Sequence, residues 1–141
     1  MSSLHFQTEP NLDVHQYADI LIRSTLSKRR PIDDLPRLDA MLQQADLIIT
    51  ARDHKDYLIG IARALTDFAY CTHLADLAVD QTHQRRGIGK RLITEVQTRS
   101  GQDTEITLLS APAAATYYPH IGLQPHRSCW VTEPGVNLRG S

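Results

Sequence analysis

The stretch from Leu77 to Ile93, LAVDQTHQRRGIGKRLI, passes from apolar residues through a short polar loop into a basic segment that contains glycine. This order predicts a strand, a loop and a helix whose first turn is rich in glycine and arginine. The unpaired N–H groups of a first helical turn and the positive end of the helix dipole attract anions. Gly87 and Gly89 carry no side chain that would keep an anion away from the backbone. The stretch therefore predicts an anion-binding site at a helix start.

Length and composition limit what the rest of the chain can be. The 141 residues are 41% hydrophobic and 22% charged, with a formal net charge of −1, which is typical of a single globular domain over residues 1–141. A net charge near zero gives no general reason to expect binding to nucleic acid or to an acidic membrane. The two cysteines, Cys71 and Cys129, form no disulfide framework and have no metal-ligand spacing. With no signal sequence and no apolar run of membrane-spanning length, we expect a soluble, cytoplasmic protein.

Periodicity predicts the element order β α α β β β α β α β. The expected strands cover Leu4–Thr8, Leu47–Ala51, Tyr57–Leu65, Tyr70–Val79, Glu105–Leu109 and Gln124–Val131. The first expected helix begins at Val14 after the cap Asp13, and the second covers Leu35–Gln44. The third follows Gly87 as far as Ser100. The fourth runs from Pro112 to Tyr118, where Pro119–Gly122 ends it. Three consecutive strands suggest antiparallel hairpins, whereas the later β–α–β unit suggests a parallel crossover. The fold class is α/β (mixed α+β), a mixed sheet flanked by helices, with residues 133–141 as a loose tail.

Two common phosphate motifs are excluded by residue type. A P-loop needs Gly-x4-Gly-Lys-Ser/Thr, but Gly89-Lys90 is followed by Arg91, and Gln84 stands where the first glycine belongs. A dinucleotide fingerprint that starts at Gly87 would need a glycine at the position of Leu92. The anion is therefore not held by either of these motifs.

Two other motifs point to one family. The segment Gln84–Gly89, QRRGIG, resembles the acyl-CoA-binding motif Gln/Arg-x-x-Gly-x-Gly/Ala of the GNAT superfamily of acetyl-CoA-dependent N-acetyltransferases. The later segment Ala113–Leu123, AAATYYPHIGL, looks like the second signature of the same family. The two motifs occur in the expected order and together cover roughly residues 70 to 125. The resemblance implies a single-domain GNAT-like fold.

The resemblance also implies acetyl-CoA as co-substrate, with no metal ion. The strand before the loop would offer backbone groups to the pantetheine arm, and the loop amides with the nearby arginines would hold the pyrophosphate. The residues carried over for these roles are Leu77, Ala78 and Val79 on the strand and Gln84, Arg85, Arg86, Gly87, Ile88, Gly89 and Lys90 in the loop and helix start.

The resemblance identifies the catalytic residues less directly than the cofactor-binding residues. Tyr118 matches the family's tyrosine near the thioester sulfur, and a phenol with a pKa of about 10 can protonate a leaving thiolate. For the general base, His73, Asp76 and water stay open as alternatives. Alternation along the strand places His73 on one face with Leu77 and Val79, provided that no bulge intervenes, whereas a bulge could move Asp76 to the other face. Cys71 is interpreted as a small buried thiol rather than as a nucleophile.

The function that the resemblance implies is transfer of an acetyl group from acetyl-CoA to a primary amine of a small molecule or a protein, by direct attack. The acceptor would bind beside the first two helices and the Asp67–Thr72 connection, and the last strand with its tail is a candidate contact if the protein is a homodimer. An acyl-CoA-binding regulatory or interaction module without turnover is the alternative. Nucleic-acid binding by the short basic stretch is not expected, because it would require a larger basic surface.

Overall fold

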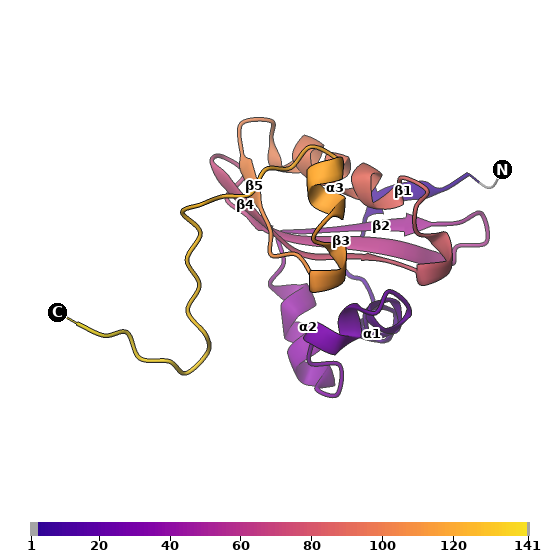
Figure 1. Cartoon of the computed structure of the whole chain (residues 1–141). Helices are drawn as coiled ribbons and strands as arrows, with labels where there is room; N and C mark the ends of the chain where they lie inside the picture. The colour runs from indigo at the N-terminus through magenta and orange to yellow at the C-terminus, as the bar shows by residue number, and fades with distance from the viewer. Residues whose placement is uncertain (1–2, 141) are drawn as a thin grey trace. The chain divides into compact units, whose positions relative to one another are not determined.

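Five strands form one mixed sheet in the order β1-β2-β3-β4-β5 in the computed structural model, which describes residues 3–140 (Figure 1). Neighbouring strands from β1 to β4 pair antiparallel, and β5 joins the edge parallel to β4 after a helical crossover. The bounds are β1 His5–Thr8, β2 Leu47–Arg52, β3 Leu58–Thr66, β4 Cys71–Val79 and β5 Glu105–Thr107. The predicted mixed α/β sheet is confirmed, although β5 ends at Thr107 and not at Leu109.

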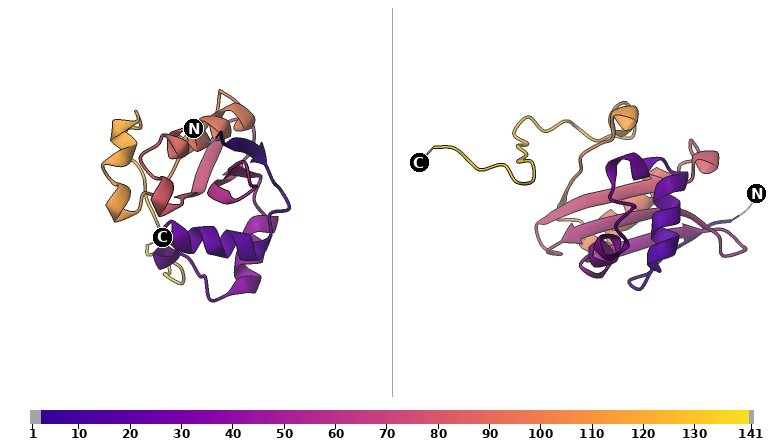
Figure 2. Two further views of the ribbon diagram at one scale, coloured as in Figure 1. Left: turned by 90° about the vertical axis from the view of Figure 1, so that its right-hand side faces the viewer. Right: turned by 90° about the horizontal axis from the view of Figure 1, so that it is seen from below.

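Helices cover both faces of this sheet. The helices α1 (Val14–Arg23) and α2 (Leu35–Gln43) lie on one face, and α3 (Ile88–Ser100) lies on the other (Figures 1 and 2). On the first face α1 and α2 bury apolar side chains against β2, β3 and β4; the cluster includes Tyr17, Ile20, Leu21, Leu38, Leu42, Ile48, Ile61 and Ala78. On the second face Gly60 of β3 admits α3 closely, since a Cβ there would lie 3.2 Å from a methyl carbon of Leu92.

The predicted helix starts are confirmed by their caps. The Asp13 carboxylate accepts from the N–H groups of His15 and Gln16 at 3.0 and 3.2 Å, and the Asp34 carboxylate accepts from that of Arg37 at 3.1 Å. These bonds satisfy N–H groups that have no partner inside the helix. Short 3-10 turns that periodicity does not reveal follow α1, as η1 (Leu26–Arg29), and β4, as η2 (Gln81–His83).

Strand β4 contains one extra residue. Asp76 pairs with Arg63 and Leu74 pairs with Ala64, so Ala75 has no partner on β3. This β-bulge reverses the alternation of side chains along the strand. Before the bulge the Thr72 hydroxyl bonds Thr104, which in turn bonds Ser100 of α3; after it the side chain of Asp76 contacts Tyr17 of α1. The even-numbered residues of β4 therefore change from the α3 face to the α1 face at Ala75.

The chain divides after Leu109 into two compact units. The second unit contains the 3-10 turn η3 (Pro112–Ala114) and the helix α4 (Tyr117–His120). The predicted continuous helix from Pro112 to Tyr118 is therefore wrong, and Pro119 lies inside α4 instead of ending it. Proline fits there because N–H groups in a first helical turn need no acceptor within the helix.

The predicted strand Gln124–Val131 is also wrong. Residues 124–131 contain neither strand nor helix, and the N–H of Cys129 bonds the carbonyl of His126 at 3.4 Å in a turn. Pro125 has no N–H to donate to a neighbouring strand. Residues 133–140 likewise have no helix or strand, and the final residue of the predicted tail lies outside the described residues. Within the part that the structure describes, no helix is long and apolar enough to cross a membrane.

Candidate functional site

The second half of β4 has an open edge. The parallel pairing with β5 joins Cys71–His73 to Glu105–Thr107 and stops there. The N–H of Asp80 bonds the carbonyl of Ile59 at 2.8 Å, so the backbone groups of even-numbered residues near this end point toward β3. Those of Leu77 and Val79 consequently face the other edge, where β5 no longer pairs. The backbone of Ala78, the third strand residue predicted to bind the cofactor, is directed toward β3.

The loop after β4 presents a row of unused amide donors. The Gln84 side chain holds the carbonyl of Val79 at 3.1 Å, and Arg85 and Gly87 have left-handed backbones with φ of 65° and 79°. The first hydrogen bond of α3 joins the N–H of Arg91 to the carbonyl of Gly87 at 3.0 Å. Among the described residues, no hydrogen bond is donated by the backbone N–H groups of residues 84–90. Such a series of free amides at a helix start is suited to an anion.

Three of the four basic side chains near this loop are available to a ligand. Arg85, Arg86 and Lys90 are exposed and have no acidic partner among the described residues. Arg91 is already engaged, because its guanidinium lies 4.6 Å from the centre of the Phe6 ring and 3.4 Å from a carboxylate oxygen of Glu95. We call residues 84–90 the phosphate loop from here on.

Asp80 connects the end of β4 to α1. Its carboxylate accepts from the N–H of Thr82 at 2.8 Å, which stabilises η2, and from Nη1 of Arg23 at 2.5 Å. Burial raises the pKa of Asp80, but the hydrogen bonds from Thr82 and Arg23 outweigh it and hold the pKa well below its usual range. The carboxylate therefore stays charged, and the turn before the phosphate loop is fixed.

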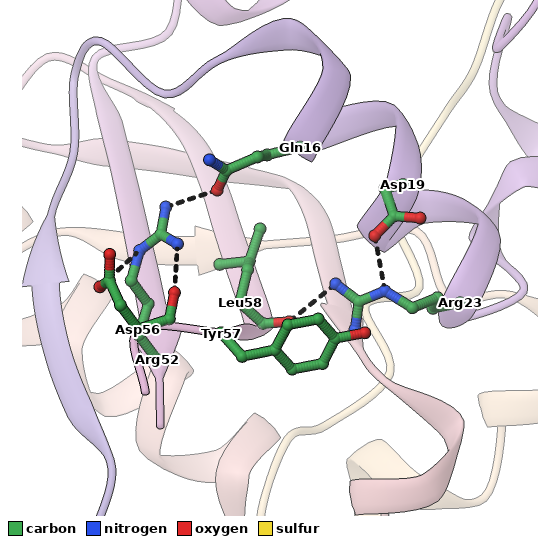
Figure 3. Close-up of a pocket in the computed structure, with 7 residues that line it drawn as sticks. All are labelled: Gln16, Asp19, Arg23, Arg52, Asp56, Tyr57 and Leu58. Carbon is green, nitrogen blue, oxygen red and sulfur yellow. Dashed lines mark hydrogen bonds and ion pairs between the residues drawn. The ribbon is translucent and has the colours of Figure 1, made fainter. Parts of the chain in front are cut away.

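Arg23 also lines a small pocket beside the β2–β3 hairpin. Its guanidinium donates to the carbonyl of Leu58 at 2.7 Å, pairs with Asp19 at 2.8 Å and lies 4.5 Å from the centre of the Tyr57 ring (Figure 3). The pocket has a volume of about 150 Å³; its lining is completed by Gln16, Arg52 and Asp56. Both arginines of the pocket are ion-paired, and Arg23 is the one that also binds Asp80.

Asp76 lies in a buried ionic cluster. Its two carboxylate oxygens pair with Nε of Arg63 at 2.6 Å and Nε of Arg30 at 2.7 Å, and the Tyr17 hydroxyl donates a further bond. Burial raises the pKa of Asp76, but the bond and charge of Arg63, with Tyr17 and Arg30, outweigh it and leave the pKa below its usual range. A carboxylate held in this way is a poor proton acceptor, which counts against Asp76 as general base.

His73 lies on β4 next to the last pairs with β5. Its side chain is exposed, and its Nδ1 lies 3.4 Å from the Thr107 hydroxyl. The shared face of His73, Leu77 and Val79 was expected only without a bulge, and the bulge at Ala75 separates His73 from the other two. His73 instead shares the α1 face with the side chain of Asp76.

Tyr118 lies in the second unit, on α4. The rings of Tyr117 and Tyr118 contact edge to face, with centroids 5.2 Å apart and planes at 74°, and both side chains are half-buried. Its role as general acid stays a prediction.

Cys71 is exposed, so the expectation of a buried thiol is wrong. The charge of Asp67 raises the pKa of this thiol, and the sulfur lies 3.7 Å from an Asp67 oxygen. A thiol kept protonated is a weak nucleophile. Cys71 is therefore unsuited to carry an acyl group.

The supporting arginines were missed by sequence reasoning. Arg63 and Asp76 each interrupt an otherwise apolar strand, and opposite charges in two neighbouring strands could have indicated a buried pair. Arg23 and Arg30 carry no such signal, since their partners lie 57 and 46 residues away in the chain. Within the described residues there is no group of three or more His, Cys, Asp or Glu side chains that could hold a metal ion.

A mixed sheet with an open strand edge that leads into a loop of unpaired amides and a helix start defines a class of anion-binding α/β protein. The sequence profile of the acetyltransferase (GNAT) domain matches residues 32–133. The chain belongs to this family.

Relatives and solved structures agree with this assignment. The chain is 32% identical over 73 residues to an uncharacterised N-acetyltransferase, ycf52, of Gracilaria tenuistipitata var. liui, an alignment that covers 50% of this chain and 40% of the relative. The ycf52 protein of Pyropia yezoensis is 28% identical over 93 residues, with 62% and 53% covered. The chain thus spans about half or less of the length of these relatives. The aminoglycoside N-acetyltransferase AAC(6')-Iy, solved with CoA, has the same fold, with a TM-score of 0.70, 19% identity and 95% and 97% of the two chains covered.

Proposed function

We propose that this protein transfers an acetyl group from acetyl-CoA to a primary amine. The observation that carries the proposal is the junction, in a member of the GNAT family, between the open edge of β4 and the phosphate loop. A long ligand with an amide-rich arm and a diphosphate has complementary chemistry to these two adjacent surfaces. The CoA complex of the similarly folded aminoglycoside acetyltransferase supports the same co-substrate.

We assign each part of the co-substrate to the residues whose hydrogen-bonding groups or charges complement it. The pantetheine amides would bond the N–H and C=O groups of Leu77 and the N–H of Val79 at that edge, while the carbonyl of Val79 stays with the Gln84 side chain. The diphosphate would bind the amides of the phosphate loop, and Arg85, Arg86 and Lys90 would neutralise its charge. Such binding would leave β3 and the buried face of β4 undisturbed.

The reaction itself needs one proton acceptor and one proton donor. The amine nitrogen attacks the thioester carbonyl carbon, the C–N bond forms, the C–S bond breaks, and CoA leaves as a thiolate. We propose His73 or water as the group that takes the amine proton, because Asp76 is held by two arginines. Following the family resemblance, we propose that Tyr118 protonates the thiolate and regains its proton from solvent.

The identity of the acceptor is proposed only at the level of its chemical class. One similarly folded protein is named as an aminoglycoside acetyltransferase, which supports an acceptor with an amino group. A cytoplasmic location and a homodimer are kept as parts of the proposal.

Thiol release with acetyl-CoA and a panel of primary amines tests the function. We expect CoA release with at least one amine, and we expect Tyr118→Phe to lower kcat by about 10²-fold or more, the range of general acid catalysis. Tyr70→Phe is the matched control, because Tyr70 is 79% exposed in the β3–β4 turn and carries no assigned role.

Other outcomes would contradict the proposal in different ways. Binding of acetyl-CoA without thiol release for any amine would indicate a binding module instead of an enzyme. Full activity of Tyr118→Phe would remove Tyr118 from the mechanism while leaving acetyl transfer in place.

A further inference from the structure

The bulge in β4 leaves one carbonyl without a strand partner. Ala75 is the extra residue between the pairs Asp76–Arg63 and Leu74–Ala64. Its carbonyl accepts a hydrogen bond from Nη2 of Arg30 at 2.6 Å. An arginine from outside the sheet therefore takes the place of a neighbouring strand at this point.

Arg30 binds the side chain of the next residue as well. Its Nε donates to Oδ1 of Asp76 at 2.7 Å, so one planar guanidinium spans the Ala75 carbonyl and the Asp76 carboxylate. The second Asp76 oxygen is bound by Arg63 and Tyr17, which fixes the carboxylate from the opposite side. Because the fork is rigid, it sets the orientation of both residues relative to each other.

The part of β4 that follows the bulge needs such support. From Leu74 onward β5 does not pair with β4, so β3 alone holds the strand by its ladder. A strand with one free edge can twist or shift, which would redirect the Leu77 and Val79 backbone groups. Arg30 fixes the peptide two residues before Leu77 and so limits this movement.

We propose that Arg30 is a positioning residue for the acyl-CoA arm: it clamps the β4 bulge so that the backbone groups of Leu77 and Val79 are oriented for the ligand. The inference rests on the proposed function, because it assumes that this edge binds the pantetheine arm. Arg30 acts through the backbone of β4 and does not itself touch the ligand. The phosphate loop does not depend on it, since that loop is anchored by Asp80 and Arg23.

Two ligands of different length separate this role from general destabilisation. Acetyl-CoA uses both the β4 edge and the phosphate loop, whereas ADP carries a diphosphate without the pantetheine arm and reports on the loop alone. In Arg30→Gln we expect the Kd for acetyl-CoA to rise about tenfold and the Kd for ADP to change less than about twofold. Arg29→Gln is the control, because Arg29 is the exposed neighbour and its side chain makes no hydrogen bond or ion pair among the described residues.

Arg30→Lys keeps the test decisive if Arg30→Gln does not fold. Lysine retains the charge beside Asp76 but cannot span two acceptors with a planar fork, so we expect the same selective loss of acetyl-CoA affinity. Equal losses for acetyl-CoA and ADP, or unchanged acetyl-CoA affinity in a folded variant, would overturn the role of Arg30. If the unmodified protein bound ADP but not acetyl-CoA, the proposed function would fail first, which distinguishes the two failures.

Discussion

The two halves of β4 are stabilised in different ways. In the first half, Cys71–His73 are paired with β5, and Thr72 and His73 are also paired with β3. The hydroxyl of Thr72 makes neutral hydrogen bonds to Thr66 and Thr104 at 2.7 and 3.1 Å. In the second half, Asp76–Val79 have a strand partner on the β3 side only, and the bulge residue Ala75 has none.

Ionic contacts from the α1 side support the second half. Arg30 and Arg63 hold Asp76, and Arg23 holds Asp80 just after the strand. The comparison shows that one strand can be paired on both sides at one end and leave the backbone groups of one edge without a strand partner at the other. In the half that lacks a β5 partner, Arg30 and Arg23 thus hold Asp76 and Asp80 in addition to the pairing with β3.

Removing Asp76 is expected to have the largest effect. Asp76→Ala leaves the guanidinium groups of Arg63 and Arg30 without their carboxylate in a buried place, and such a loss destabilises a protein by about 3–5 kcal/mol. Thr72→Val, in the paired half, removes only neutral hydrogen bonds and should cost about 1 kcal/mol. Urea unfolding of both variants measures the difference, and equal losses would mean that the two halves are stabilised alike.

Acid should weaken the open half first. The folded-state pKa of Asp76 lies below its ordinary value of 3.8, so its contribution to stability is present above that pH and is lost as the pH falls below it. Each unit of lowering corresponds to about 1.4 kcal/mol. Asp76→Asn should therefore be less stable at neutral pH but should lose less stability between about pH 5 and pH 2. Parallel stability curves for the two proteins would contradict this expectation.

Substitutions of Gly87 test the phosphate loop, which follows the open half of β4. A β-branched residue strains a backbone with φ of 79°, at a cost of about 1–2 kcal/mol. We expect Gly87→Val to weaken acetyl-CoA binding about tenfold, and Gly87→Asn to recover most of the affinity because asparagine tolerates this conformation. A Cβ at Gly87 meets no protein atom within 4 Å, so a steric clash within the protein cannot account for the loss. Calorimetry of the two variants gives the comparison, and equal weakening would point away from backbone strain.

The smallest effects are expected from Arg91 and Arg86, of which one should contribute to stability and the other to acetyl-CoA binding. Arg91→Gln loses the contact with the Phe6 ring, which is worth about 0.5–1 kcal/mol of stability, and should leave acetyl-CoA affinity unchanged. Arg86→Gln should leave stability unchanged and weaken acetyl-CoA binding by a factor of about five, or about 1 kcal/mol. Thermal unfolding and a binding titration provide both readouts, and a reversed pattern would assign the phosphate contact to Arg91.

Local signals in the sequence predicted the parts of the fold that depend on neighbouring residues. The cap at Asp13, the helix after Gly87 and the strand that precedes the phosphate loop all follow from short-range patterns, and the structure has them. The family resemblance came from two short patterns, the spacing of glycine and arginine in Gln84–Gly89 and the later segment Ala113–Leu123.

Features that depend on distant residues were not predicted. An extra residue at Ala75 leaves the apolar composition of β4 unchanged, so alternation alone gave the wrong face for His73. The predicted strand Gln124–Val131 has suitable residues, but a strand also needs a partner, which residue composition does not specify. Arg30 and Arg23 reach β4 from the α1–η1 segment, and only the folded chain brings them there.

The raised pKa of Cys71 affects how readily this thiol can be acylated by a thioester. A thioester donor can acylate any accessible thiolate, and Cys71 is an exposed thiol two residues before His73 on the strand proposed to bind that donor. Asp67 receives three backbone N–H bonds, from Ala69, Tyr70 and Cys71, which hold its own pKa at about 2 and keep it charged beside the sulfur. This negative charge disfavours the thiolate, so we expect Cys71 to react slowly with acyl donors.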